Sequence, residues 1–152
     1  LARKGGAEHR LECRILSGEV PLTATEGALQ PIAIDHAFQF PTKWWSRGRP
    51  RYVDVMARRG AVPWVVELKV GTAQGEYYRD GIVQAALYRE FILRSPGLDP
   101  WFDHHGLNLS ECRAALLIPP LRGPREEQLR ADHQRVSRLF GVELIEEPAA
   151  VL

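Results

Sequence analysis

The chain has 152 residues, of which 45% are apolar and 26% are charged, with a formal net charge of +1. This length suits a single domain, residues 1–152, that buries roughly 70% of the surface of its unfolded chain. The composition excludes a low-complexity chain and a uniformly basic nucleic-acid binder. No apolar run approaches the roughly 20 residues of a membrane span, so no membrane partner is expected. The first residue is Leu1 and not Met, which favours a domain cut from a longer protein.

The two cysteines, Cys13 and Cys112, lie in apolar stretches far apart in the sequence. Neither has a Cys or His neighbour at zinc-site spacing. Because a disulfide would need an oxidising compartment, we expect two reduced, buried thiols in a cytoplasmic protein.

Hydrophobic periodicity predicts the elements in chain order. Strands are expected at residues 10–16, 31–40, 51–58, 63–70, 112–118 and 142–147, and helices at residues 76–94 and 124–140. The link over residues 59–62 is short enough for a hairpin. Residues 95–111 are expected to be irregular, anchored to the core by Trp101 and Phe102. This order predicts an α/β (α+β) domain, with a central mixed sheet of four to five strands flanked by helices and a parallel, right-handed crossover to residues 112–118.

The run VVELKV, residues 65–70, places two charged residues inside an apolar strand. Because side chains alternate between the faces of a strand, Glu67 and Lys69 share one face. Ionised groups inside a sheet are costly to desolvate unless they are paired or bind a metal ion. The run therefore indicates either a metal site or a same-face ion pair.

A second carboxylate, Asp54, interrupts the preceding apolar strand. A hairpin symmetric about Gly60 and Ala61 places Asp54 directly opposite Glu67, with Cβ atoms about 4.5–5.5 Å apart. Two carboxylates repel at that separation unless a cation joins them, and Mg²⁺ accepts carboxylate oxygens at about 2.0–2.1 Å. Pairing geometry alone thus predicts a metal site at Asp54 and Glu67. The alternative is that Asp54 is a charge at a strand edge.

Asp54, followed thirteen residues later by Glu67-Leu68-Lys69, resembles the signature of the PD-(D/E)XK nuclease superfamily. Gln84 and Tyr88, which share a face of the expected helix, resemble the additional Gln-x-x-x-Tyr motif of RecB-type members. The resemblance is close over residues 52–88. It implies a restriction-endonuclease-like core and a nuclease that hydrolyses phosphodiester bonds with Mg²⁺ or Mn²⁺, in DNA or alternatively in RNA.

The resemblance also implies a role for each residue of the motifs. Asp54 and Glu67 would bind the metal ion, and Lys69 would orient the attacking water or stabilise the phosphate. Gln84 and Tyr88 would position the nucleic acid or the catalytic residues.

One part of the family pattern is not met in the predicted elements. Family members usually carry a Glu on a helix before the first strand. Glu8 and Glu12 are the early candidates here, but Glu12 falls in an expected strand. The first helix is then expected before Leu1, and a catalytically inactive module that binds nucleic acid or a protein partner is the alternative function.

Residues 43–51 (KWWSRGRPR) interleave basic and aromatic side chains, as surfaces that follow a nucleic-acid strand do. Phosphate contacts are expected from Lys43, Arg47, Arg49 and Arg51. The alternative is a loop with one buried Trp and solvated Arg side chains. Besides DNA, the expected partner is the rest of a parent protein or a partner subunit.

Two other pairs, Asp35-His36 and His104-His105, carry residue types that bind metals. A buried, hydrogen-bonded pair is the stronger interpretation of Asp35-His36. A solvated loop is the stronger interpretation of His104-His105.

Overall fold

The computed structural model describes residues 6–32, 40–42, 51–71 and 76–148. Within them a six-stranded mixed sheet has the order β1-β2-β5-β6-β7-β8, and β3 pairs with β4 separately. The strands are β1 (Leu22–Ala24), β2 (Gly27–Pro31), β3 (Phe40–Thr42), β4 (Arg51–Val53), β5 (Val55–Arg59), β6 (Val62–Leu68), β7 (Arg113–Ile118) and β8 (Val142–Glu146). The helices are α1 (Gly6–Leu16), α2 (Glu76–Leu93), α3 (Asp99–His104) and α4 (Glu126–Phe140), with short 3₁₀ turns at Pro96–Leu98 and Leu109–Glu111.

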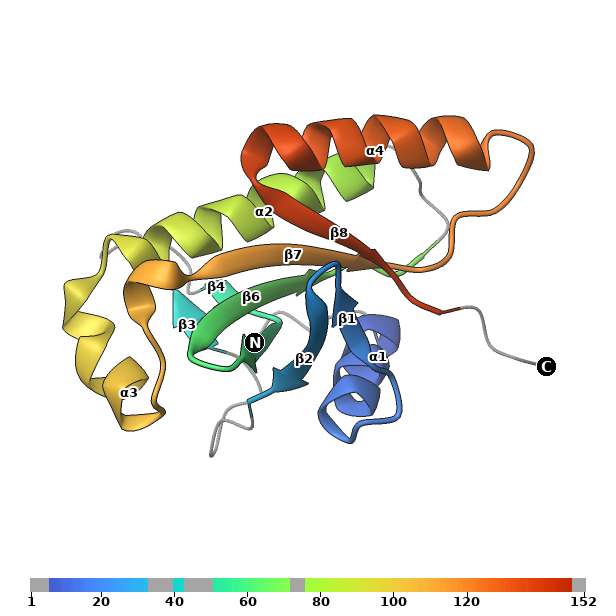
Figure 1. Cartoon of the computed structure of the whole chain (residues 1–152). Coiled ribbons are helices and arrows are strands. Elements are labelled where there is room, and N and C mark those ends of the chain that lie inside the picture. Colours follow the sequence, from blue (N-terminus) through green and yellow to red (C-terminus); the bar gives the residue numbers. More distant parts are fainter. Residues whose placement is uncertain (1–5, 33–39, 43–50, 72–75, 149–152) are drawn as a thin grey trace.

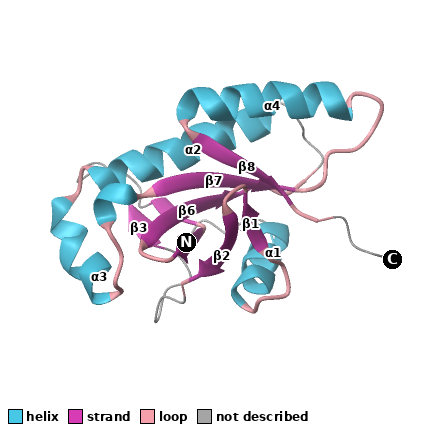
Figure 2. Cartoon of the chain, viewed as in Figure 1, coloured by secondary structure: helices cyan, strands magenta, loops and turns pink. Residues whose placement is uncertain are grey.

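The helices form layers on both faces of the sheet (Figures 1 and 2). On one face, Leu11 and Ile15 of α1 pack in a core cluster with Val66 of β6. On the other face, Ile82 of α2 packs in a second cluster with Val65 of β6. The alternation of neighbouring residues between two cores makes β6 a central strand buried on both faces, as parallel pairing with β7 requires.

The predicted hairpin is confirmed, and its register is the expected one from Val55 to Arg59. The predicted pair of Asp54 opposite Glu67 falls outside this register, because Asp54 forms a bend before β5 begins. Val55 pairs with Val66 and Arg59 pairs with Val62 across antiparallel β5 and β6. Gly60 has φ 61°, the left-handed conformation that a tight hairpin turn needs. The crossover through α2 is also confirmed, because β7 runs parallel to β6, and β8 runs parallel to β7 after α4.

The prediction of a strand over residues 10–16 is wrong, because this segment belongs to helix α1. Its buried residues are Leu11, Glu12 and Ile15, a spacing of three and four that matches one face of a helix. Glu8 in the first turn and Arg14 in the last turn also complement the helix dipole. Seven residues that appear to alternate are too short a window to exclude a helical period.

Other strands differ from the predicted ones in extent. The strand expected over residues 63–70 is β6, Val62–Leu68, so Lys69 follows the strand and is not part of it. The expected strand over residues 51–58 is broken by a bend at Asp54, which separates β4 from β5. The sheet has six strands and not four or five, because residues 22–31 form a β1-β2 hairpin at its edge. Of the expected strand over residues 31–40, Pro31 ends β2 and Phe40 begins β3, while residues 33–39 lie outside the described ranges.

Some of the remaining structural predictions are confirmed and others are wrong. Helices α2 and α4 and strands β7 and β8 lie where they were predicted. The prediction that residues 95–111 are irregular is wrong, because α3 and two 3₁₀ turns lie within them. Phe102 is fully buried and Trp101 packs against the same core, so both anchor this segment as predicted. Cys112 is buried as predicted, but Cys13 is exposed on α1.

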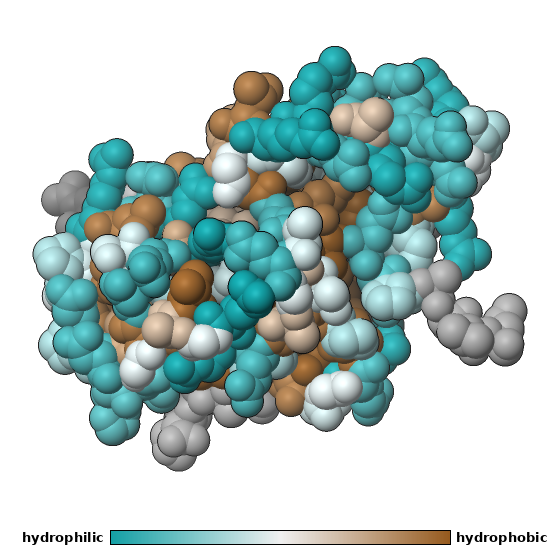
Figure 3. Space-filling model, viewed as in Figure 1, coloured by the Kyte–Doolittle hydropathy of each residue, from teal (hydrophilic) through white to brown (hydrophobic). Residues whose placement is uncertain are grey.

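Hydrophilic residues cover most of the face seen in Figure 3, with hydrophobic residues showing in seams between them. Among the described helices, none combines the length and the apolar character needed to span a membrane.

Candidate active site

Two carboxylates are buried at the carboxyl end of β6. Asp54 is 4% exposed and Glu67 is 5% exposed. The bend at Asp54 turns its side chain toward β6, where Oδ2 accepts a 2.8 Å hydrogen bond from the backbone N–H of Leu68. The register of the hairpin and this hydrogen bond together hold the carboxylate of Asp54 beside the residue that follows Glu67.

Lys69 completes this group of side chains. Its Nζ lies 3.0 Å from Oε1 of Glu67, and the two side chains are 12% and 6% exposed. The same-face ion pair expected from the sequence is therefore present, and it is largely buried.

Helix α2 passes Lys69 at unusually short range because it carries a glycine there. A Cβ atom on Gly81 would lie 2.9 Å from Cγ of Lys69 and 2.8 Å from Cδ1 of Leu116. Only glycine leaves room for the lysine stem between helix and sheet. The position of the ammonium group is therefore set by helix packing as well as by its ion pair with Glu67.

Tyr77 and Glu8 add a phenol and a third carboxylate to the site. The Tyr77 hydroxyl donates a 2.6 Å hydrogen bond to Oε1 of Glu8, and Nζ of Lys69 lies 5.2 Å from the centre of the Tyr77 ring. Burial, then Glu8, and then the charges of Glu67 and Asp54 raise the pKa of Tyr77 above its ordinary value. The phenol therefore stays protonated near neutral pH and acts as a hydrogen-bond donor.

The early acidic residues lie on a helix, α1, where a strand was predicted. Glu8 and Glu12 are one turn apart on α1. Glu12 is fully buried, with Oε2 3.6 Å from Nδ1 of His9, whereas Glu8 contacts Tyr77. The wrong strand prediction concealed this helix. Tyr77 was missed because nothing in its local pattern distinguishes it from Tyr78.

Gln84 and Tyr88, the two residues of the predicted helix motif, lie in different environments. Tyr88 is 6% exposed and belongs to the apolar core. Gln84 is half-buried, and its Oε1 has no hydrogen-bond partner among the described residues. Counting from the contact of Gly81 with Lys69, Gln84 lies about one turn further along α2 and Tyr88 about two turns, roughly 10 Å. Gln84 is thus the nearer of the two to Lys69 along the helix.

Several predicted residues lie outside the described part of the chain. These are Lys43, Arg47, Arg49, Asp35, His36 and the side chain of Arg51, whose backbone begins β4. His104 and His105 end α3 with ring centres 5.3 Å apart, and the His105 ring lies 4.3 Å from that of Trp101. The second histidine is thereby placed against an aromatic neighbour.

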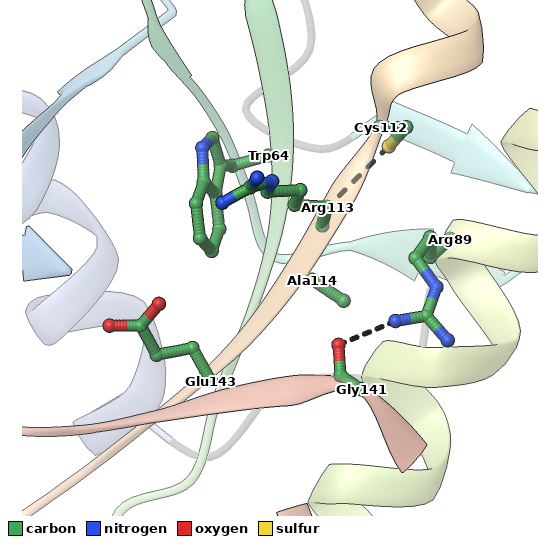
Figure 4. Close-up of a pocket in the computed structure, with 7 residues that line it drawn as sticks. All are labelled: Trp64, Arg89, Cys112, Arg113, Ala114, Gly141 and Glu143. Atoms are coloured by element: carbon green, nitrogen blue, oxygen red, sulfur yellow. Dashed lines mark hydrogen bonds between the residues drawn. The ribbon is translucent and has the colours of Figure 1, made fainter. Parts of the chain in front are cut away.

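A separate pocket of about 210 Å³ lies near the amino ends of β7 and β8 (Figure 4). It is lined by Trp64, Arg89, Cys112, Arg113, Ala114, Gly141 and Glu143.

The charged groups of this pocket are engaged with the protein itself. Arg89 donates 2.6 Å and 2.8 Å hydrogen bonds to the carbonyls of Gly141 and Phe140. Arg113 pairs with Glu26 at 2.8 Å and lies over the ring of Trp64. Glu143 accepts a hydrogen bond from the backbone N–H of Thr25. We interpret the pocket as a junction of secondary-structure elements.

Asp54 and Glu67 are the residues of this site that could take part in holding a metal ion. Across the described ranges, no three His, Cys, Asp or Glu side chains are grouped so as to hold a metal ion. Mg²⁺ commonly uses one or two carboxylates together with water and substrate phosphates. Asp54 and Glu67 supply two such carboxylates at one strand end, which matches this mode of binding.

Comparisons with protein-family models, with curated proteins and with solved structures found no match to this chain.

Proposed function

We propose that this domain is a Mg²⁺-dependent nuclease of the PD-(D/E)XK type that hydrolyses phosphodiester bonds in DNA. The observation that carries the proposal is the group of Asp54, Glu67 and Lys69, buried together at one strand end. Burial of ionisable groups is costly, and such groups are concentrated at functional sites. The residue types and their spacing are those of the nuclease signature.

The order of elements supports a restriction-endonuclease-like core. The family core is a helix, three strands, a helix and a strand. Here α1 precedes the strands β2, β5 and β6, and α2 and then β7 follow. The signature residues lie on the β5-β6 hairpin and at its base, next to the crossover helix.

Each side chain has a proposed role in hydrolysis. Asp54 and Glu67 would hold the ion, which when bound lowers the pKa of a water ligand and neutralises charge on the phosphate. Lys69 would donate hydrogen bonds to the attacking water or to a phosphate oxygen. Gln84 would donate its amide to the nucleic acid, and the basic residues 43–51 would contact phosphates without reading sequence.

The test is cleavage of linear and circular DNA, compared in Mg²⁺, Mn²⁺ and EDTA. The protein should cleave with either metal ion and not in EDTA. Asp54→Asn and Glu67→Gln should each abolish cleavage while the fold survives, because the amide of Asn can still accept the Leu68 N–H. Glu143→Gln, at the other end of the sheet, is the matched control and should retain activity. Cleavage that persists in EDTA, or in both site variants, would refute the proposal.

A non-catalytic module that binds nucleic acid is the second candidate. It is favoured by the Glu67–Lys69 ion pair, which satisfies these two charges without a metal ion. This candidate predicts DNA binding with no cleavage under any metal condition. Calorimetric titration with Mg²⁺ separates the two, since only the nuclease requires metal binding.

A further inference from the structure

We propose that Tyr77 is a positioning residue of this site, which holds the carboxylate of Glu8 and the ammonium of Lys69 in fixed places relative to Asp54 and Glu67. This inference rests on the proposed nuclease function. It assigns a role to a residue that the nuclease signature does not include.

One side chain makes both contacts through different parts of its surface. The 2.6 Å bond from the hydroxyl to Glu8 has the length of a charge-assisted O–H···O⁻ hydrogen bond, about 2.5–2.7 Å. Lys69 Nζ lies 5.2 Å from the ring centre, inside the roughly 6 Å range of a cation–π contact. The phenol can therefore orient the carboxylate of Glu8 and the ammonium group of Lys69 at the same time.

The contact also joins two helices that lie on opposite faces of the sheet. Glu8 is in the first turn of α1, and Tyr77 is in the first turn of α2. First turns carry backbone N–H groups without helical partners and fray readily. The Tyr77–Glu8 hydrogen bond ties these turns together at the carboxyl end of β6, beside Lys69, and so limits the movement of Glu8 away from the other carboxylates.

The neighbouring tyrosine shows what a purely structural role looks like. Tyr78 is 1% exposed, packs in the core, and donates a 3.1 Å hydrogen bond to the carbonyl of Gly71. Tyr77 is only half-buried, and although it packs at the margin of the same core, it also lies near the charges of Glu8, Glu67 and Asp54. Tyr78→Phe thus removes a hydroxyl from the same helical turn without touching Glu8 or Lys69, and it serves as the matched control.

The first experiment needs no metal ion. Thermal unfolding in EDTA is compared for the parent, Glu8→Ala, which removes the hydrogen-bond acceptor, Tyr77→Phe, which removes the donor, and the double variant. The double variant should lose no more stability than the larger single loss, because both changes break one hydrogen bond. Additive losses would show that the contact is absent in solution and would overturn the inference.

The second experiment measures the rise of Tm with Mg²⁺. A ligand that binds only the folded state raises Tm by mass action. Asp54 and Glu67 are the proposed ligands, and Glu8 is a charged partner outside that pair. Mutation of such outer partners commonly weakens metal affinity about 10- to 100-fold. Tyr77→Phe should therefore need at least about tenfold more Mg²⁺ for half of the parent's shift, while Tyr78→Phe should keep the parent's midpoint despite a lower Tm.

Cleavage adds a third, independent readout. Tyr77→Phe keeps the ring under Lys69, so saturating Mg²⁺ should restore its cleavage rate. Tyr77→Leu removes the ring as well, and its maximal rate should stay low. If Mg²⁺ raises the Tm of the parent, and Tyr77→Phe needs the same Mg²⁺ concentration for half of the shift, the role of Tyr77 is overturned while the metal site stands. A parent whose Tm ignores Mg²⁺ would overturn the metal site itself, and the role of Tyr77 with it.

Discussion

The charged side chains at the two ends of the sheet have different partners. Near the amino ends of β7 and β8, Arg113 is paired with Glu26, and Arg89 is bound to backbone carbonyls (Figure 4). At the carboxyl end of β6, the acids Glu8, Asp54 and Glu67 surround one phenol and one ammonium group.

Under the proposed function, the charged groups at the first end stabilise the fold, whereas those at the second end serve the site. Ion pairs and carbonyl contacts at the first end join elements of the structure. At the second end Glu67 is also paired with Lys69, and Asp54 accepts the Leu68 N–H, but three carboxylates lie near a single ammonium group. This excess of negative charge is a local cost of the kind expected where a site serves function. The predictions below test this distinction, beginning with the largest expected effect.

Replacement of Lys69 should separate the two ends most clearly. Lys69→Met keeps the packed stem and removes the ammonium group, and it should lower the cleavage rate by about 10²- to 10³-fold, the usual effect of deleting one electrostatic donor. Arg113→Met, at the other end, should leave the rate unchanged. The rates are measured under saturating Mg²⁺, and equal losses in the two variants would remove the distinction.

Insertion of a methyl group at Gly81 should disturb the packing beside Lys69. In Gly81→Ala the new Cβ would lie 2.8 Å from the core side chain of Leu116, and overpacking of this kind costs about 1–3 kcal/mol. The helix propensity of Ala offsets up to about 1 kcal/mol of that cost. We expect Tm to fall by a few degrees. The cleavage rate, measured at a temperature where the variant is still folded, should also fall, because Lys69 is displaced. Gly97→Ala, whose Cβ would meet nothing within 4 Å, is the control.

We expect His133, on α4, to make the packing of α4 on the rest of the domain sensitive to acid. His133 is 2% exposed, and neither ring nitrogen has a hydrogen-bond partner among the described residues. Burial lowers its pKa, Arg79 lowers it further, and Asp132 opposes the shift. The unfolded chain then binds a proton more readily than the folded one, so this contribution to stability is complete above the ordinary pKa of 6.5 and is lost as pH falls below it.

The measurement is Tm between pH 5 and pH 8. His133→Leu should flatten the acid side of the curve, whereas His104→Gln, at an exposed position on α3, should leave its shape unchanged. A parallel curve for His133→Leu would show that another group controls the acid sensitivity.

The smallest effect is expected from the ion pair at the amino end of β7. Arg113 and Glu26 have side chains about half exposed, 48% and 50%. Exposed pairs contribute about 0.2–1 kcal/mol and are screened by salt. A double-mutant cycle with Arg113→Met and Glu26→Gln, followed by denaturant unfolding, should give a coupling in this range that shrinks in high salt. A coupling well above it would mean that this end is less solvated than its exposure indicates.

Local pattern was sufficient wherever an element was long or its turn was constrained. The apolar period of α2 and α4, together with Gly141 after the latter, predicted both helices. The symmetric hairpin placed Val55 opposite Val66 as the structure has it. The short run RLECRIL misled because its apolar residues fit a period of two as well as a period of three to four. In the structure the run is helical, and Leu11 and Ile15, which lie one turn apart, are the apolar residues that it buries in the core.

For the candidate site, the sequence by itself determined which residues of the hairpin carry charge and that Glu67 and Lys69 share a face. This follows from the fixed two-residue period of a strand. Only the tertiary structure decided that Glu8 of α1 and Tyr77 of α2 meet at the same strand end. Residues 69 positions apart are brought together by packing on opposite faces of the sheet, and no local periodicity records such a contact. The close approach at Gly81 has the same origin, since the absence of a side chain acquires meaning only against Lys69 and Leu116.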